Sequence, residues 1–124
     1  MTMGIEFLPD KPIYQQLIDR IIGEIIRGTL QPGEKLPSVR DYAVEAGVNA
    51  NTMQRVYKEL EQMEITETRR GQGSFVTEDE TKIAKVRDAM KDQLITSFIQ
   101  SVEAFGFTTD EMIHHLQERG GNDD

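Results

Sequence analysis

The 124-residue sequence predicts a mainly α-helical fold with one small β-hairpin. Apolar residues recur three and four positions apart in several segments, which is the spacing of an amphipathic helix. Glycine, or a capping serine, asparagine or threonine, stands at the borders of these segments. Between residues 64 and 78, β-branched residues instead flank a glycine-rich turn, which is typical of a hairpin.

A first helix is expected from Pro12 to Arg27. Its apolar residues lie four apart, at Ile13, Leu17, Ile21 and Ile25. Proline suits the first turn of a helix, where its missing N–H is no loss, and Gly28 suits the position just past the end. The two prolines and the glycine between residues 29 and 37 then predict a turn.

Two short helices are expected next, joined by a turn centred on Gly47. Ser38, followed three residues later by Asp41, resembles a capping arrangement that begins the second helix. Asn49 can cap a third helix that continues to Met63. Such a pair of helices is a helix-turn-helix. The core face of the third helix is expected to carry Met53, Val56, Tyr57, Leu60 and Met63.

The segment after Met63 predicts the hairpin, with Arg69 and Arg70 at its glycine-rich tip. Beyond it, apolar residues from Ile83 to Phe105 predict one long helix, which Gly106 ends. A capping box from Thr108 to Glu111 predicts a last short helix. We expect residues 1–79 to form one domain, residues 80–119 to form a separate helical element, and residues 120–124 to be a disordered tail.

The long apolar stripe has no matching helix within the chain, so we expect it to be buried on a partner. The residues expected to contact this partner are Val86, Met90, Leu94, Phe98, Val102, Phe105, Met112 and Leu116.

Composition excludes several classes of protein. Without cysteine there is no disulfide and no thiolate zinc site. The adjacent His114 and His115 point in different directions on a helix and cannot share a metal by themselves. We find no nucleophile–base set and no phosphate loop, so we expect neither an enzyme nor a cofactor. No secretory signal and no spanning apolar run occur, which predicts a cytoplasmic protein without a membrane partner.

Four segments together resemble the GntR family: PIYQQL, GTLQPGEKLPSVRDYA, GVNANTMQRVYKELE and RRGQGSFV. They cover about two thirds of the chain in the family's order. The resemblance implies a winged helix-turn-helix, in which the hairpin is the wing. The two last helices are similar to those of the YtrA-like branch of the family, in which a short helical tail dimerises. The resemblance therefore implies that residues 80–119 are a helical dimerisation element. It also implies that the partner of the apolar stripe is a second copy of the chain, so the stripe residues named above are the predicted dimerisation residues.

The resemblance also implies which residues bind double-stranded DNA. The third helix would enter the major groove, and Gln54 and Arg55 are long enough to reach base edges. Arg40 matches the arginine of the family's LP-x-x-R motif, and the wing arginines would lie along the minor groove. The predicted DNA-binding residues are Ser38, Arg40, Asn49, Asn51, Thr52, Gln54, Arg55, Lys58, Arg69, Arg70, Gly71 and Gly73. Many relatives carry arginine where this chain has Ala50 and Gln54, so their base contacts do not transfer.

Plainer interpretations exist for each of these residues. Arg55 and Lys58 could form a solvated face that pairs with Glu59 or Glu61, and Arg40 could face Asp41 or Glu45. Tyr14 and Tyr57 fit core positions better than a stacking role. The net charge of −8 opposes DNA binding unless the cations cluster locally.

The expected function is that of a homodimeric repressor on a palindromic operator, with transporter genes as targets by resemblance. The alternative is a winged-helix module that binds a protein instead of DNA, and no feature of the sequence announces an effector.

Overall fold

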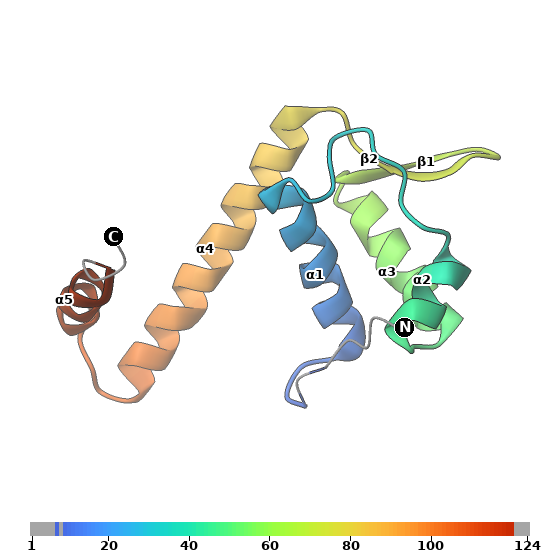
Figure 1. The fold of residues 1–124 in the computed structure, drawn as a ribbon. Coiled ribbons are helices and arrows are strands. Elements are labelled where there is room, and N and C mark those ends of the chain that lie inside the picture. The colour runs from blue at the N-terminus through green and yellow to red at the C-terminus, as the bar shows by residue number, and fades with distance from the viewer. Residues whose placement is uncertain (1–6, 8, 121–124) are drawn as a thin grey trace. The chain divides into compact units, whose positions relative to one another are not determined.

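The computed structural model describes residue 7 and residues 9–120 of the chain, and it confirms the mainly helical fold with a hairpin wing (Figure 1). The elements in chain order are α1 (Ile13–Arg27), α2 (Val39–Ala46), α3 (Ala50–Gln62), β1 (Thr66–Arg69), β2 (Gly73–Val76), α4 (Glu80–Ala104) and α5 (Thr109–Gly120). The chain divides into two compact units, which meet within α4 between Arg87 and Asp88.

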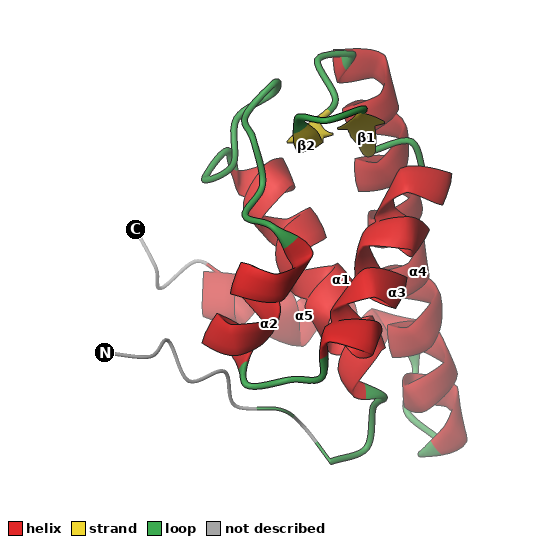
Figure 2. Ribbon diagram, turned by 90° about the vertical axis from the view of Figure 1, so that its right-hand side faces the viewer, coloured by secondary structure: helices red, strands yellow, loops and turns green. Residues whose placement is uncertain are grey.

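The core of the first unit lies where α1 and α2 both pack against α3. Figure 2 shows these helices in red beside the two short yellow strands. Leu17 and Ile21 of α1 and Met53 and Leu60 of α3 are fully buried. Met63, by contrast, caps the C-terminal end of α3 and is exposed, so the predicted core face of α3 ends one turn earlier than expected.

The caps of the helix-turn-helix form as predicted. The Ser38 hydroxyl accepts a hydrogen bond from the Asp41 N–H at 3.0 Å. The Asn49 side-chain oxygen accepts one from the Asn51 N–H at 2.7 Å. Between the two helices Gly47 adopts a left-handed conformation, with φ of 73°, which glycine tolerates without strain. The turn therefore fixes α3 against α2.

The wing, which comprises β1, β2 and the turn between them, is tied to the loop before α2. Its strands are antiparallel, with Thr66 opposite Val76 and Arg69 opposite Gly73. The Leu36 N–H donates to the Ser74 carbonyl and the Val76 N–H donates to the Glu34 carbonyl, each at 2.8 Å. Residues 34–36 therefore run along β2 and hold the wing beside the start of α2.

In the second unit the predicted capping box begins α5. The Glu111 N–H donates to the Thr108 hydroxyl, and the Thr108 N–H donates to the Glu111 carboxylate, both at 3.1 Å. Gly106, in a left-handed conformation, separates α4 from α5. Gly120 is the last residue of α5, and the rest of the predicted tail, residues 121–124, lies outside the described residues. The predicted domain boundary after residue 79 stays a prediction.

No helix in the described part of the chain combines the length and the apolar character needed to cross a membrane.

Candidate nucleic-acid interface

The cations of the helix-turn-helix and wing come from a few neighbouring elements. Between residues 28 and 76 the cations are Lys35, Arg40, Arg55, Lys58, Arg69 and Arg70. All are exposed except Arg69, which is half-buried. They stand on the loop before α2, the start of α2, the outer face of α3 and the wing. The cations of this segment therefore stand on the same elements as the predicted DNA-binding residues.

The inner face of α3 packs in the core, and its outer face is exposed. The two sides of this outer face, its flanks, have different neighbours. Asn51 and Lys58 lie opposite the buried Met53 and Leu60 at helical spacing. On one flank, Gln54 and Lys58 line a groove whose other residues are Val39, Tyr57, Glu61, Thr68 and Ser74. This flank therefore faces the wing.

The other flank of α3 faces α1. The guanidinium carbon of Arg55 lies 3.6 Å from the ring centroid of Tyr14, a half-buried residue in the first turn of α1. The predicted ion pair of Arg55 with Glu59 is not among the ion pairs of residues 9–120. Tyr14 is thus neither a core residue nor a free ring, because its face is covered by Arg55.

The start of α2 combines a cap, Ser38, with one cation, Arg40. Ser38 accepts the Asp41 N–H, while its hydroxyl proton can still be donated to another group. Arg40 is exposed and makes no ion pair within the described residues, so the predicted pairing with Asp41 or Glu45 does not occur there. Of the predicted residues at the start of α3, Asn49 and Asn51 are exposed and Thr52 is half-buried.

Lys35 is a cation of this surface that the sequence analysis missed. It forms an isolated β-bridge with Phe75 and lines an open groove together with Ser38, Gln72 and Ser74. The signal in the sequence is its position three residues before the capping serine, in GEKLPS. That signal is weak, because only the pairing of residues 34–36 with β2 brings Lys35 to the wing.

The two wing arginines differ in freedom. The Arg69 guanidinium lies 4.1 Å from the Phe75 ring centroid and 3.4 Å from a Glu67 carboxylate oxygen. Arg70 is exposed at the turn and has no ion pair or ring contact among residues 9–120. From the sequence, both arginines were predicted to bind the minor groove in the same way.

The two wing glycines also differ. Gly71 lies in the turn with φ of 76°, and a Cβ there would meet nothing within 4 Å. At Gly73, with φ of 109°, a Cβ would lie 3.2 Å from the Cε atom of Lys35. The close approach at Gly73 is therefore made by a side chain of the same protein. Only Gly71 is open to an approaching ligand.

Tyr57 is a core residue that contacts the segment directly before α2. It is buried, and its hydroxyl donates to the Pro37 carbonyl at 2.6 Å, directly before Ser38. Its ring packs edge-on against Tyr42, with centroids 6.3 Å apart. Burial raises the pKa of Tyr57 and, together with the nearby Glu24 carboxylate, that of Tyr42. Both tyrosines are core residues, as the spacing of Tyr57 predicted.

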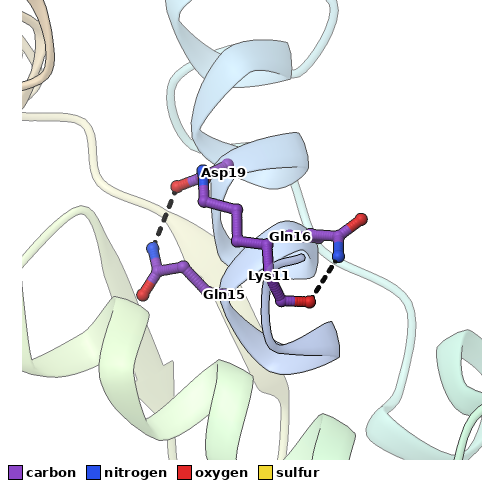
Figure 3. Close-up of polar contacts among 4 residues, drawn as sticks. All are labelled: Lys11, Gln15, Gln16 and Asp19. Atoms are coloured by element: carbon purple, nitrogen blue, oxygen red, sulfur yellow. Dashed lines mark hydrogen bonds and ion pairs between the residues drawn. The ribbon is translucent and has the colours of Figure 1, made fainter. Parts of the chain in front are cut away.

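Lys11, just before α1, is exposed but is paired with a carboxylate of α1 (Figure 3). The Lys11 ammonium lies 2.9 Å from the Asp19 carboxylate, which also accepts a hydrogen bond from Gln15 at 3.0 Å. The Gln16 amide donates to the Lys11 carbonyl at 2.7 Å. Lys11 is therefore already neutralised and does not join the cationic set.

The predicted dimerisation residues differ in exposure. Leu94, Phe98, Phe105 and Leu116 are exposed, Met90 and Met112 are half-buried, and Val86 and Val102 are buried. In residues 88–120, three further large apolar residues are exposed that are not in the predicted dimerisation set, namely Ile95, Phe107 and Ile113. Among the described residues, no cluster of three His, Asp or Glu side chains could hold a metal ion.

Comparisons with known proteins place this surface in context. The family model described as "Bacterial regulatory proteins, gntR family" matches residues 13–76, which include α1, the helix-turn-helix and the wing. The HTH-type transcriptional regulator YhcF of Bacillus subtilis is 39% identical over 115 residues, covering 93% of this chain and 95% of that protein. The HTH-type transcriptional repressor YtrA of the same organism is 37% identical, covering 74% of this chain and 75% of that protein.

Solved structures share the fold. A GntR family transcriptional regulator from Listeria monocytogenes has 38% sequence identity and a TM-score of 0.82, covering 90% of this chain and 98% of that one. The DNA-binding domain of AraR in complex with operator ORE1 has 27% identity and a TM-score of 0.52, covering 60% of this chain and 89% of that one.

Proposed function

Because the chain belongs to the GntR family and is a DNA-binding transcriptional regulator, we propose that it acts as a homodimeric repressor on a palindromic operator. The observation that supports this most directly is the polar outer face of α3, which lies between a groove beside the wing and the start of α1. A helix exposed in this way can enter the major groove of DNA. The family is one of regulators, and the chain is not an enzyme.

In this proposal α3 supplies the base contacts. Its first turn carries the exposed Asn49 and Asn51 and the half-buried Thr52, and an N-terminal turn of this kind favours the phosphates beside the groove. Gln54 extends from the flank that faces the wing, and its amide suits an adenine edge. The Ala50 side chain cannot hydrogen-bond to a base, so the discrimination between operator sequences depends on the few polar side chains of α3, such as Asn51 and Gln54.

Backbone contacts would surround this helix. Ser38 and Arg40 lie at the start of α2, Lys58 borders the groove, and Lys35 adds a charge beside the wing. Arg70 and the open Gly71 are suited to the minor groove, whereas the Arg69 guanidinium is already paired with the Glu67 carboxylate on the wing. Each such phosphate contact would make binding weaker as salt rises.

Dimerisation is proposed to use the exposed part of the apolar stripe, with Leu94 and Phe98 on α4 and Leu116 on α5. One α3 recognises only a few base pairs, and each good base contact contributes about 1–3 kcal/mol of discrimination. Two linked copies would double this contribution and match the two half-sites of a palindrome.

Repression would follow from occupancy, because a protein bound at its operator excludes RNA polymerase from an overlapping promoter. The name of YtrA, a repressor, supports this sign of regulation. Transporter genes are the proposed targets, as the resemblance to YtrA-like regulators suggests.

Selection from random DNA tests the proposal. The purified full-length chain should enrich a palindrome with half-sites about one helical turn apart. An Asn51→Ala, Gln54→Ala double variant should lose that enrichment, while Lys85→Ala, on an exposed site of α4, should retain it. A fusion of the enriched promoter to a reporter should gain expression when the gene is deleted. Enrichment of no palindrome would contradict the proposal, and lower reporter expression after deletion would contradict repression.

A further inference from the structure

We propose that Tyr14 is a positioning residue for DNA binding, whose ring holds the Arg55 guanidinium so that this group binds a backbone phosphate beside α3. The inference rests on the proposed function. It adds a role for Tyr14 and a phosphate contact for Arg55, neither of which the proposed function specifies. From the sequence, Arg55 was expected to reach a base edge. The geometry around its side chain favours the phosphate.

The first argument is the direction in which Arg55 extends. Gln54 and Arg55 are neighbours on α3, and successive residues of a helix are about 100° apart around its axis. Gln54 borders the groove beside the wing, whereas Arg55 lies over Tyr14 of α1. When a helix lies in the major groove, the middle of its outer face points to the bases and its flanks meet the sugar–phosphate strands. Arg55 is on such a flank.

The second argument is the partner that Arg55 takes. Glu59 is four residues further along α3, the usual spacing of a helical ion pair, yet the guanidinium lies 3.6 Å from the Tyr14 centroid. The face of an aromatic ring attracts a cation without neutralising its charge. A guanidinium that lies over a ring keeps its N–H edge available, and that edge can bind a phosphate through two parallel hydrogen bonds.

The third argument is preorganisation. An exposed arginine loses the freedom of several rotatable bonds when it binds, which lowers affinity. Tyr14 is half-buried in the first turn of α1, and α1 packs directly on α3, so its ring is a fixed support. The stack therefore restricts Arg55 before DNA arrives. Tyr14 acts through Arg55 and need not touch the DNA itself.

A double-mutant cycle in the full-length chain tests this inference. The duplex enriched by the wild-type chain is titrated by fluorescence anisotropy over a series of salt concentrations. The variants are Tyr14→Leu, Tyr14→Phe, Arg55→Ala and the Tyr14→Leu, Arg55→Ala double variant, with Lys85→Ala as the control for loss of a cation elsewhere. Thermal unfolding of each variant is measured beside the titration, and Tyr14→Met replaces Tyr14→Leu in the cycle if the latter unfolds.

Arg55→Ala should reduce the slope of log K against log salt by about 0.9 for each protomer bound. Tyr14→Leu should weaken binding about two- to fivefold for each protomer. It should have no further effect when Arg55 is already alanine. Tyr14→Phe, which keeps the ring, and Lys85→Ala should bind like the wild type, and the sequence enriched by Arg55→Ala should be unchanged.

Three results would overturn the inference. Equal losses for Tyr14→Leu in the presence and absence of Arg55 would show that the two residues act independently. A loss for Tyr14→Phe as large as for Tyr14→Leu would assign the role to the hydroxyl. A changed base preference with an unchanged salt slope for Arg55→Ala would place Arg55 on a base. Failure of the wild-type chain to enrich any duplex would instead refute the proposed function.

Discussion

The two arginines at the tip of the wing show how neighbours in sequence can differ in role. Arg69 is held by the Phe75 ring and the Glu67 carboxylate. Arg70 is exposed, with neither kind of partner among residues 9–120. A side chain without internal partners loses no protein contact when it binds DNA. We therefore assign the minor-groove contact to Arg70 and a supporting role in the wing to Arg69.

Alanine substitutions separate these two roles. Arg70→Ala should weaken operator binding by at least about fivefold and leave the unfolding midpoint unchanged, because it removes a charge-assisted contact of roughly 1–3 kcal/mol in the complex only. Arg69→Ala should lower the unfolding free energy by about 0.5–1 kcal/mol through loss of the ring contact. Anisotropy titrations and thermal unfolding measure the two effects. A larger binding loss for Arg69→Ala than for Arg70→Ala would reverse the assignment.

Tyr57 links the core to the start of α2 through its hydrogen bond to the Pro37 carbonyl. Tyr57→Phe should lower the unfolding free energy by about 1 kcal/mol, the usual net contribution of such a bond. Denaturant unfolding of the wild-type and variant chains at neutral pH measures this difference. An unchanged midpoint would show that the hydrogen bond to the Pro37 carbonyl contributes nothing net to the free energy of unfolding, because water donates to that carbonyl in its place.

The same tyrosine makes stability depend on alkaline pH. Burial raises the pKa of Tyr57 above the ordinary value of 10.0, so the folded chain keeps the proton that the unfolded chain releases. Its contribution to stability is complete below pH 10 and is lost as the pH rises above that value. The wild-type chain should therefore lose stability more steeply than Tyr57→Phe above pH 10. Tyr42, whose pKa is also raised, is present in both chains.

At the scale of the element, α2 depends on its caps because it has only eight residues. Ser38 both accepts the Asp41 N–H and lies where we propose a DNA phosphate. Ser38→Ala should lower the unfolding free energy by about 0.5–2 kcal/mol through loss of the cap. Ser38→Asp should retain the stability, since aspartate caps equally well, but bind the operator at least about fivefold more weakly because of its charge. Binding by Ser38→Asp at the wild-type level would place the phosphate elsewhere.

The elements could be predicted from sequence where their determinants are local. The bounds of α2, α3 and α5 follow from caps whose donor and acceptor lie two or three residues apart, such as Thr108 and Glu111. The pairing of residues 34–36 with β2 and the contact of Arg55 with Tyr14 join positions about forty residues apart in sequence. No periodicity or spacing encodes such contacts, so Lys35 was missed and Tyr14 was assigned to the core.

At the scale of the whole molecule, the acidic charge is unevenly distributed. Residues 1–87 contain 12 Lys and Arg against 14 Asp and Glu, a formal charge of −2, whereas residues 88–124 contain two against eight, a formal charge of −6. Most of the net negative charge of the chain, which opposes DNA binding, therefore lies in the second unit. The unit that carries the candidate interface is nearly neutral, and its cations need to overcome little repulsion.

This distribution predicts that dimerisation and DNA binding respond to salt in opposite directions. Two second units of like charge repel each other, and salt screens that repulsion, while exposed apolar residues such as Leu94 and Phe98 supply the attraction. The dimer dissociation constant should therefore fall as salt rises from low concentration, whereas operator binding weakens. Sedimentation of the free chain and anisotropy titration of the duplex, over the same salt series, measure the two trends.

The same measurement tests the apolar stripe itself. Phe98→Asp should raise the dimer dissociation constant by at least about tenfold, because the 41% of Phe98 that is exposed in one copy would be buried in both copies of the dimer and the new carboxylate adds repulsion. Thr96→Asp adds the same charge to the opposite face of α4, where Thr96 is exposed, and should change dimerisation only slightly. Equal effects of the two variants would show that the added charge alone weakens the dimer, and that Phe98 makes no apolar contact across the interface. A wild-type chain that sediments as a monomer at every salt concentration would refute dimerisation through this stripe.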